Sequence, residues 1–177
     1  PDMGDGYYNL AAALHQSGVR YNRPDDLKQA EVLYNQALER SPDHVECYRG
    51  LAVLLNETGR RDASYRLLNN WAAASPQNPN PRIELARLLE ESSRPQEAEQ
   101  QLVQALTVDP NDARALAALG RLRDEAGDQM QALQNYQRSL AVNRNQPQVA
   151  ARVATLQTAG GALLTTGAPS TQMANQW

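Results

Sequence analysis

The sequence predicts an all-α protein built from about four repeated helix pairs and a closing helix, and three observations carry this prediction. First, apolar residues make up 41% of the 177 residues, yet aromatic residues reach only 5% and phenylalanine is absent, so helix-forming Leu and Ala, with Val, must fill the core. Second, similar residues recur every 34 positions. Third, glycine or proline follows most of the expected helices.

The 34-residue spacing holds in six columns of one register, which chance does not explain. The columns are Pro42, Pro76 and Pro110; Ala30, Ser64, Ala98 and Ala132; Tyr34, Leu68, Leu102 and Tyr136; Leu51, Leu85 and Leu119; Ala52, Ala86 and Gly120; and Gly59, Ser93 and Gly127. Small residues let two helices approach, large apolar residues fill the space between repeats, and Gly and Pro end helices. These roles predict helices over 5–17, 25–40, 44–58, 61–74, 78–92, 95–108, 112–126 and 129–142.

The repeat pattern is broken at three positions. About seven extra residues between Gly18 and Ala30 predict an extended loop or a lengthened helix end over 19–25. Trp71 stands where the neighbouring repeats have alanine. Arg144 occupies the place of a fourth proline.

This arrangement of small, large and proline positions resembles the tetratricopeptide repeat family over about residues 7–156. The second repeat carries it through Tyr48, Leu51, Ala52, Leu55, Gly59, Ser64, Leu68 and Pro76, and the other repeats supply matching sets. The resemblance implies a right-handed α-solenoid of four helix-turn-helix repeats, at about 4–44, 45–78, 79–112 and 113–146. A capping helix is expected over 147–158, because three apolar residues share one face there and an open solenoid needs a polar outer end.

The last segment, 159–177, contains no charged residue and is rich in small and amide residues. Its composition predicts a flexible tail. The large apolar residues Leu163, Leu164 and Trp177 are the possible anchors by which such a tail would dock into a groove, its own or a neighbour's.

The resemblance implies a protein-interaction scaffold whose concave face, lined by the first helix of each repeat, binds a peptide or helix of a partner. The predicted lining comprises Tyr8, His15, Arg49, Asn56, Ile83, Arg87, Glu90, Arg114, Arg121 and Asp124, together with Ala12, Val53 and Ala117. Arg pairs with carboxylates in a planar, bidentate way, so the arginine row favours a partner with acidic side chains or a free C-terminus. A solvated face without a partner is the alternative for any single residue.

Two further patterns bear on this face. Glu57, Glu91 and Glu125 form a second 34-residue ladder near helix C-termini, where the dipole disfavours negative charge, and we interpret it as a salt-bridged rim with Arg60, Arg61 and Arg94. The carboxylate clamp of chaperone-binding family members is absent, since its positions hold Tyr8, Ala12, Gly50, Asn80 and Glu84.

Signals of chemistry are weak. The two histidines lie on different repeats and the single cysteine, Cys47, gives no zinc spacing, so no metal, cofactor or enzymatic activity is predicted. Cys47 is expected to pack as a small apolar residue. A net charge of −3 argues against nucleic acid as a partner.

Two other functions remain open: a regulatory or substrate-docking segment of a larger enzyme or of a cell-envelope assembly system, and self-association through the tail. The run 143–147 resembles a stretch of a pilus-assembly tetratricopeptide lipoprotein, which with the composition indicates a bacterial origin. No stretch approaches the length of a membrane span. The chain opens with Pro1, so a missing upstream segment is expected, and the compartment stays open between cytoplasm and cell envelope.

Overall fold

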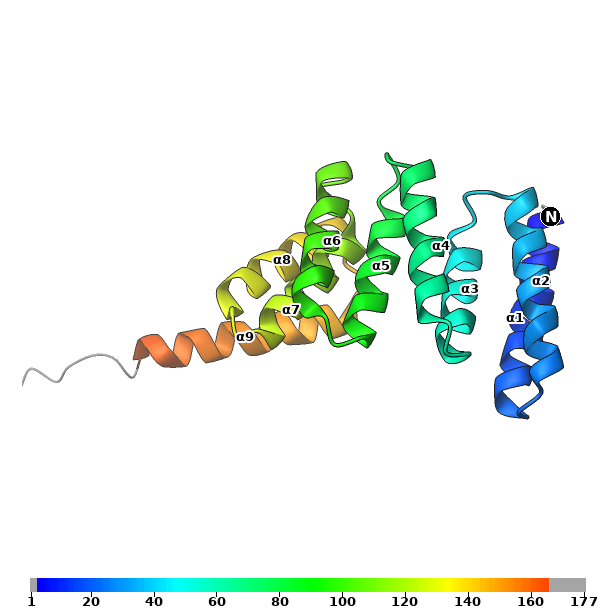
Figure 1. The fold of residues 1–177 in the computed structure, drawn as a ribbon. Coiled ribbons are helices and arrows are strands. Elements are labelled where there is room, and N and C mark those ends of the chain that lie inside the picture. Colours follow the sequence, from blue (N-terminus) through cyan, green and yellow to red (C-terminus); the bar gives the residue numbers. More distant parts are fainter. Residues whose placement is uncertain (1–2, 166–177) are drawn as a thin grey trace, which may run out of the picture. The chain divides into compact units, whose positions relative to one another are not determined.

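The computed structural model describes residues 3–165, and these form helices joined by short turns (Figure 1). The helices are α1 (Met3–Arg20), α2 (Pro24–Arg40), α3 (Val45–Glu57), α4 (Arg61–Ala74), α5 (Asn80–Glu91), α6 (Pro95–Val108), α7 (Ala113–Glu125), α8 (Gln129–Val142) and α9 (Pro147–Thr165). They divide into an amino-terminal unit, Pro1–Val108, and a carboxy-terminal unit, Asp109–Trp177. The predicted helix pairs and closing helix are therefore all present.

The amino-terminal unit consists of three helix pairs, α1/α2, α3/α4 and α5/α6, and successive pairs pack through α2 on α3 and α4 on α5. One apolar cluster joins the first two pairs, and its buried members are Ala11, Ala30, Leu33, Tyr34, Ala37, Cys47, Leu51, Leu54 and Leu55. A second cluster joins α3, α4 and α5 through Ala52, Leu68, Trp71, Leu85 and Leu88. Because each pair buries its apolar face against its neighbours, the stack rather than any single pair carries the core.

Small residues mark places where helices come close together, as the column that contains Gly120 predicts. A Cβ added to Gly50 of α3 would lie 2.7 Å from the ring of Tyr34 in α2, and one added to Gly120 of α7 would lie 2.7 Å from Tyr136 in α8. Both tyrosines are buried in these contacts. The glycines thus make room for the large rings that fill the space between helices.

The turn inside each of the last three pairs uses one backbone conformation. Gly59 and Gly127 adopt positive φ angles of 77° and 87°, and Ser93, in the same column, has a φ of 57°. Only glycine reaches this left-handed region without steric cost. In the carboxy-terminal unit, side chains cap both paired helices. Asp112 accepts hydrogen bonds from the N–H groups of Arg114 and Ala115 at the start of α7, and Asp128 accepts one from the N–H of Gln131 at the start of α8.

The two irregularities of the first pairs have physical explanations. The insertion in the first repeat mainly lengthens α1, which reaches Arg20, so only three residues separate it from α2; of the two predicted possibilities, the lengthened helix end is the one observed. Trp71 is 2% exposed and stacks on Tyr48, with ring centroids 4.0 Å apart and planes 6° apart. The indole therefore contributes a large buried contact between α3 and α4.

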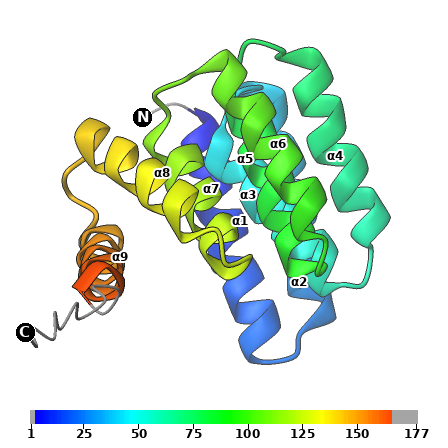
Figure 2. The same cartoon turned by 90° about the vertical axis from the view of Figure 1, so that its left-hand side faces the viewer.

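In the carboxy-terminal unit, α7 and α8 pair closely and α9 packs on α8 (Figure 2). Val153 and Leu156 of α9 are buried against Ala132 and Tyr136 of α8, as expected of a capping helix. The helix runs to Thr165, seven residues beyond its predicted end at 158, so residues 159–165 are helical where a flexible tail was predicted. The composition argument weighed the missing charges and neglected the helix propensity of Ala and Leu.

The proposed tail anchors lie mostly outside the described part of the chain. Leu163 and Leu164 are on α9, but their side-chain surroundings are not described, and Trp177 lies beyond the described residues. None of the helices formed by residues 3–165 combines the length and the apolar composition that crossing a bilayer requires.

Candidate interaction surfaces

A buried carboxylate organises the predicted inner face of the amino-terminal unit. Glu84 of α5 is 1% exposed, and its Oε1 accepts hydrogen bonds from Nε and Nη2 of Arg49 in α3 at 3.0 and 2.5 Å. Its Oε2 accepts one from Nε of Arg87 at 3.1 Å. The bond to Glu84 raises the pKa of Arg49 above its ordinary value. Arg49 thus joins α3 to α5 through Glu84, whereas Arg87 bonds to the same carboxylate from within α5.

The ladder of glutamates is paired, but with partners other than those expected. Glu57 lies 2.7 Å from Nε2 of His15 in α1, and Glu91 bonds to Arg87 and accepts from Asn56 at 3.3 Å. In the carboxy-terminal unit, Arg121 lies 3.5 Å from Glu125. The three arginines predicted to neutralise the ladder make other contacts: Arg60 with Glu31, Arg61 with Asn56, and Arg94 with Glu97. Each glutamate of the ladder therefore pairs, within its own unit, with a residue of the predicted lining.

Tyr8 and His15 belong to a packed cluster of rings in the first repeat. The ring of Tyr8 lies 4.8 Å from that of His44, and Nδ1 of His15 lies 3.3 Å from the hydroxyl of Tyr34. Burial raises the pKa of Tyr34 well above its ordinary value, and nearby Tyr8 adds to the effect. Of the other predicted residues, Ile83 is a core residue at 9% exposure. These side chains stabilise helix contacts more than they offer a recognition surface.

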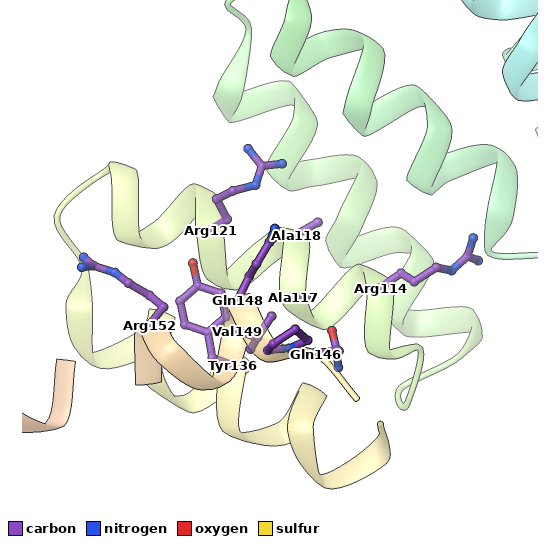
Figure 3. Close-up of a pocket in the computed structure, with 10 residues that line it drawn as sticks. Arg114, Ala117, Ala118, Arg121, Tyr136, Gln146, Gln148, Val149 and Arg152 are labelled. Carbon is purple, nitrogen blue, oxygen red and sulfur yellow. The ribbon is translucent and has the colours of Figure 1, made fainter. Parts of the chain in front are cut away.

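The carboxy-terminal unit has an open pocket between α7 and α9, with α8 beneath it (Figure 3). Its volume is about 640 Å³, and it is lined by Arg114, Ala117, Ala118, Arg121, Tyr136, Gln146, Pro147, Gln148, Val149 and Arg152. The side chains of Arg114 and Arg121 are each 50% exposed and that of Arg152 is 42% exposed. No carboxylate is among these lining residues, so the pocket combines a cationic rim with apolar walls.

One ion pair holds the walls of this pocket together. Arg152 of α9 donates from Nε and Nη2 to the two carboxylate oxygens of Asp124 in α7, the second at 2.6 Å. The hydrogen bond from Arg152 lowers the pKa of Asp124, and one from the Tyr136 hydroxyl lowers it further. Asp124 therefore fixes α9 beside α7 instead of lining the pocket.

The structure brings some predicted residues together and leaves others apart. Arg114, Ala117 and Arg121 share the pocket of the carboxy-terminal unit, whereas Arg49 and Arg87 converge on Glu84. Glu84 and Arg152 are the residues that sequence reasoning missed as site residues. Neither falls in a repeated column, so only their charge among apolar neighbours hinted at a partner.

The described residues offer binding geometry more than reactive groups. Among residues 3–165, no three His, Cys, Asp or Glu side chains converge as a metal site would require. Cys47 is fully buried, its thiol donates to the Tyr34 carbonyl oxygen at 3.1 Å, and burial raises its pKa to about 12. The thiol is thus protonated and packed as predicted.

Comparison with known proteins agrees with this architecture. The model of the tetratricopeptide repeat family matches residues 23–79 and 62–122, together more than half of the chain. Among solved structures, Pseudomonas aeruginosa PilF is 27% identical, with a TM-score of 0.63 over 90% of this chain and 72% of that one. MamA, 17% identical, has a TM-score of 0.59 over 81% of this chain and 84% of its own. A thermophilic tetratricopeptide protein of Thermus thermophilus, 18% identical, has a TM-score of 0.58 over 86% of this chain and 84% of its own. The last two likenesses show the fold alone. No curated protein matches the sequence significantly.

Proposed function

Because the chain belongs to the tetratricopeptide repeat family, we propose that it is a scaffold that holds a peptide or helical segment of a partner protein. Proteins of this family are in general protein-interaction scaffolds and not enzymes. The single observation that carries the proposal is the open pocket of the carboxy-terminal unit, lined by Arg114, Ala117 and Arg121. These residues lie on the first helix of the fourth repeat, where the family resemblance implies binding.

The size and lining of the pocket support a peptide as the bound species. Its volume of about 640 Å³ has room for more than one side chain and falls within the range of about 300–1,000 Å³ typical of ligand sites. Apolar walls with a few polar groups at the rim are also the usual composition of such sites. The pocket is open, so a chain passing over it can insert side chains into it.

The inner face of the amino-terminal unit supports binding less directly. Its central arginines, Arg49 and Arg87, already bond to Glu84, so a partner carboxylate there would have to compete with a buried one. Loss of that pairing carries the cost of leaving Glu84 without its cations. The proposal therefore places the first contact of a partner in the carboxy-terminal unit.

The test is selection of peptides from a random display library on the full chain, followed by calorimetric measurement of the enriched sequences. We expect enrichment of peptides that bind at a one-to-one ratio, with dissociation constants of about 1 μM to 1 mM. A variant with the pocket filled, Ala117→Leu, should lose part of this binding, whereas Arg66→Gln, on the surface of α4, should not. Recovery of no peptide above the background of the bare support would refute the proposed function.

A further inference from the structure

We propose that the pocket between α7 and α9 selects a peptide segment carrying two carboxylates about 10 Å apart with a large apolar side chain between them. This inference rests on the proposed function and specifies its partner. It follows from three features of the lining: its charge, the spacing of its arginines and the small residues between them.

The charge of the lining selects against cationic and neutral segments. Arg114, Arg121 and Arg152 line the pocket, and the carboxylates nearest to them, Asp112, Asp124 and Glu125, do not. Charge complementarity of this kind contributes more to specificity than to affinity, because bringing like charges together makes the free energy of binding less favourable. An acidic segment is therefore the complementary occupant.

The two half-exposed arginines of α7 set the spacing. Arg114 and Arg121 are seven residues apart, which is two helical turns, so they share a face at an axial separation of about 10.5 Å. Both have partners in the chain, Asp112 at 3.4 Å and Glu125 at 3.5 Å. A guanidinium carries five donors, so a further carboxylate can bind beside an existing one. A peptide in the polyproline II conformation has three residues per turn and rises about 3.1 Å per residue, so its side chains three residues apart share one face at a separation of about 9 Å.

The floor between these arginines calls for an apolar side chain. Ala117 and Ala118 lie between Arg114 and Arg121 on α7 and leave space above the helix, while Val149 lines the pocket from α9 and the ring of Tyr136 lines it from α8 (Figure 3). A leucine or an aromatic side chain placed here would remove apolar surface from water on both sides, at about 25 cal/mol per Å². The pocket thus recognises a peptide with two acidic residues separated by two residues, of which one is large and apolar.

Arg152 has a positioning role in this recognition. Its bidentate bond to Asp124 holds α9 beside α7, and this bond fixes the width of the pocket. The separation of roles predicts that changing Arg121 weakens binding without loosening the pocket, whereas changing Asp124 alters the pocket itself.

The experiment is an NMR titration of the full, isotopically labelled chain with blocked synthetic peptides. The probe has the sequence Ser-Gly-Glu-Leu-Leu-Glu-Gly-Ser, and two controls replace both Glu by Lys or both Leu by Ser. We expect the probe to shift amide signals of residues 114–121 and 146–152, with the Lys peptide producing no such shifts. The Ser peptide should bind more weakly than the probe, and 0.5 M NaCl should weaken the binding of the probe because it screens the charges.

Variants of the chain give the second readout. Arg121→Gln should raise the dissociation constant of the probe about two- to fivefold, as expected for a half-exposed ion pair, whereas Arg66→Gln, an equal change of charge on α4, should leave it unchanged. Ala117→Leu should abolish the shifts while its own spectrum stays folded. Equal binding of the Glu and Lys peptides, shifts confined to other residues, or tighter binding of oligothymidylate at the same amides would each overturn the inference.

Failure of this inference is distinguishable from failure of the proposed function. If peptides selected from the random library bind the chain but map to α1, α3 and α5, the scaffold function stands and the specificity assigned to the α7–α9 pocket is wrong. If neither the library nor the probe yields a bound peptide, both proposals fall together.

Discussion

Replacing Glu84 by glutamine tests whether a buried carboxylate joins α3 to α5. The native side chain is 1% exposed and accepts three hydrogen bonds, two from Arg49 and one from Arg87. Glutamine keeps the shape and one acceptor oxygen but turns N–H donors toward a guanidinium. The variant therefore loses charge-assisted bonds without creating a cavity, so its stability reports the electrostatic contribution.

The expected loss follows from these bonds and from the exposure of the arginines. Hydrogen bonds to charged groups contribute about 1.5–3 kcal/mol each, yet the three cannot simply be added. The side chains of Arg49 and Arg87 are 42% and 32% exposed and regain water when the carboxylate is removed. We therefore expect Glu84→Gln to lower the free energy of unfolding by about 1.5–3 kcal/mol. For a chain of this size, that corresponds to a fall in Tm of about 3–12 °C.

Urea unfolding followed by circular dichroism measures this loss, with Glu39→Gln as the control. Glu39 is exposed on α2, and its replacement by glutamine changes the net charge by the same amount. The free energy of unfolding of this variant should therefore stay within about 0.5 kcal/mol of the wild type. A double-mutant cycle with Arg49→Met should give a coupling energy of about 1–3 kcal/mol. A Glu84→Gln variant as stable as the control, or a coupling energy near zero, would show that the pair does not hold α3 against α5.

Four smaller perturbations test the rest of the packing. Gly50→Ala should lower the free energy of unfolding by about 1–3 kcal/mol, because the new Cβ would lie 2.7 Å from a buried tyrosine ring. Gly6→Ala, whose Cβ would have nothing within 4 Å, should raise it by up to about 1 kcal/mol. Equal urea midpoints for the two variants would contradict this. Ser93→Gly should raise the free energy of unfolding by about 0.5–1 kcal/mol, since the backbone of Ser93 has a φ of 57°, which glycine adopts without steric cost. An unchanged Tm would show that the backbone at Ser93 is not strained. Asp124→Asn should lower the urea midpoint at pH 7. Because the folded protein lowers the pKa of this carboxyl, its contribution is present above pH 3.8 and is lost as the pH falls further, so the difference in urea midpoint from the wild type should narrow below pH 3.8. A difference independent of pH would refute the assignment. The buried thiol of Cys47, with a pKa of about 12, should react with a disulfide reagent at pH 8 only as urea opens the fold; rapid labelling of the native chain would contradict its burial.

The repeat columns predicted the helices well because they encode local chemistry that every repeat shares. The left-handed residue at Gly59, Ser93 and Gly127 ends a helix in each case, and this requirement is visible in sequence as small residues 34 apart. The length of α9 could not be read in the same way, because no repeat follows it to provide a comparison. There, composition and helix propensity pointed in opposite directions, and propensity prevailed through Thr165.

The contacts between α3 and α5 could not be predicted from the repeat columns. A column aligns equivalent positions of successive repeats, whereas each of these contacts joins positions that are not equivalent. Arg49 bonds to Glu84 and Asn56 bonds to Glu91, both 35 residues apart, so each partner lies one residue beyond the 34-residue column. The sequence predicted a row of arginines, and in the amino-terminal unit two of them, Arg49 and Arg87, bond to Glu84. It could not show that a carboxylate of the next repeat already occupies part of it.

The same reasoning explains why the carboxy-terminal unit provides the better candidate site. Between α3 and α5 two polar contacts follow one another along the helices, from Arg49 to Glu84 and from Asn56 to Glu91. Between α7 and α9 one pair, Asp124 with Arg152, links the two helices from the last turn of α7, while small and apolar residues leave a pocket nearer the start of both helices. A scaffold of this family needs both arrangements, because paired charges keep successive helices in register and an unfilled space gives a partner somewhere to bind. Gln148 lines the pocket from α9 and Arg121 lines it from α7. Replacing Gln148 by glutamate, which offers Arg121 a carboxylate within the chain, should therefore close the pocket, reduce peptide binding and raise the free energy of unfolding.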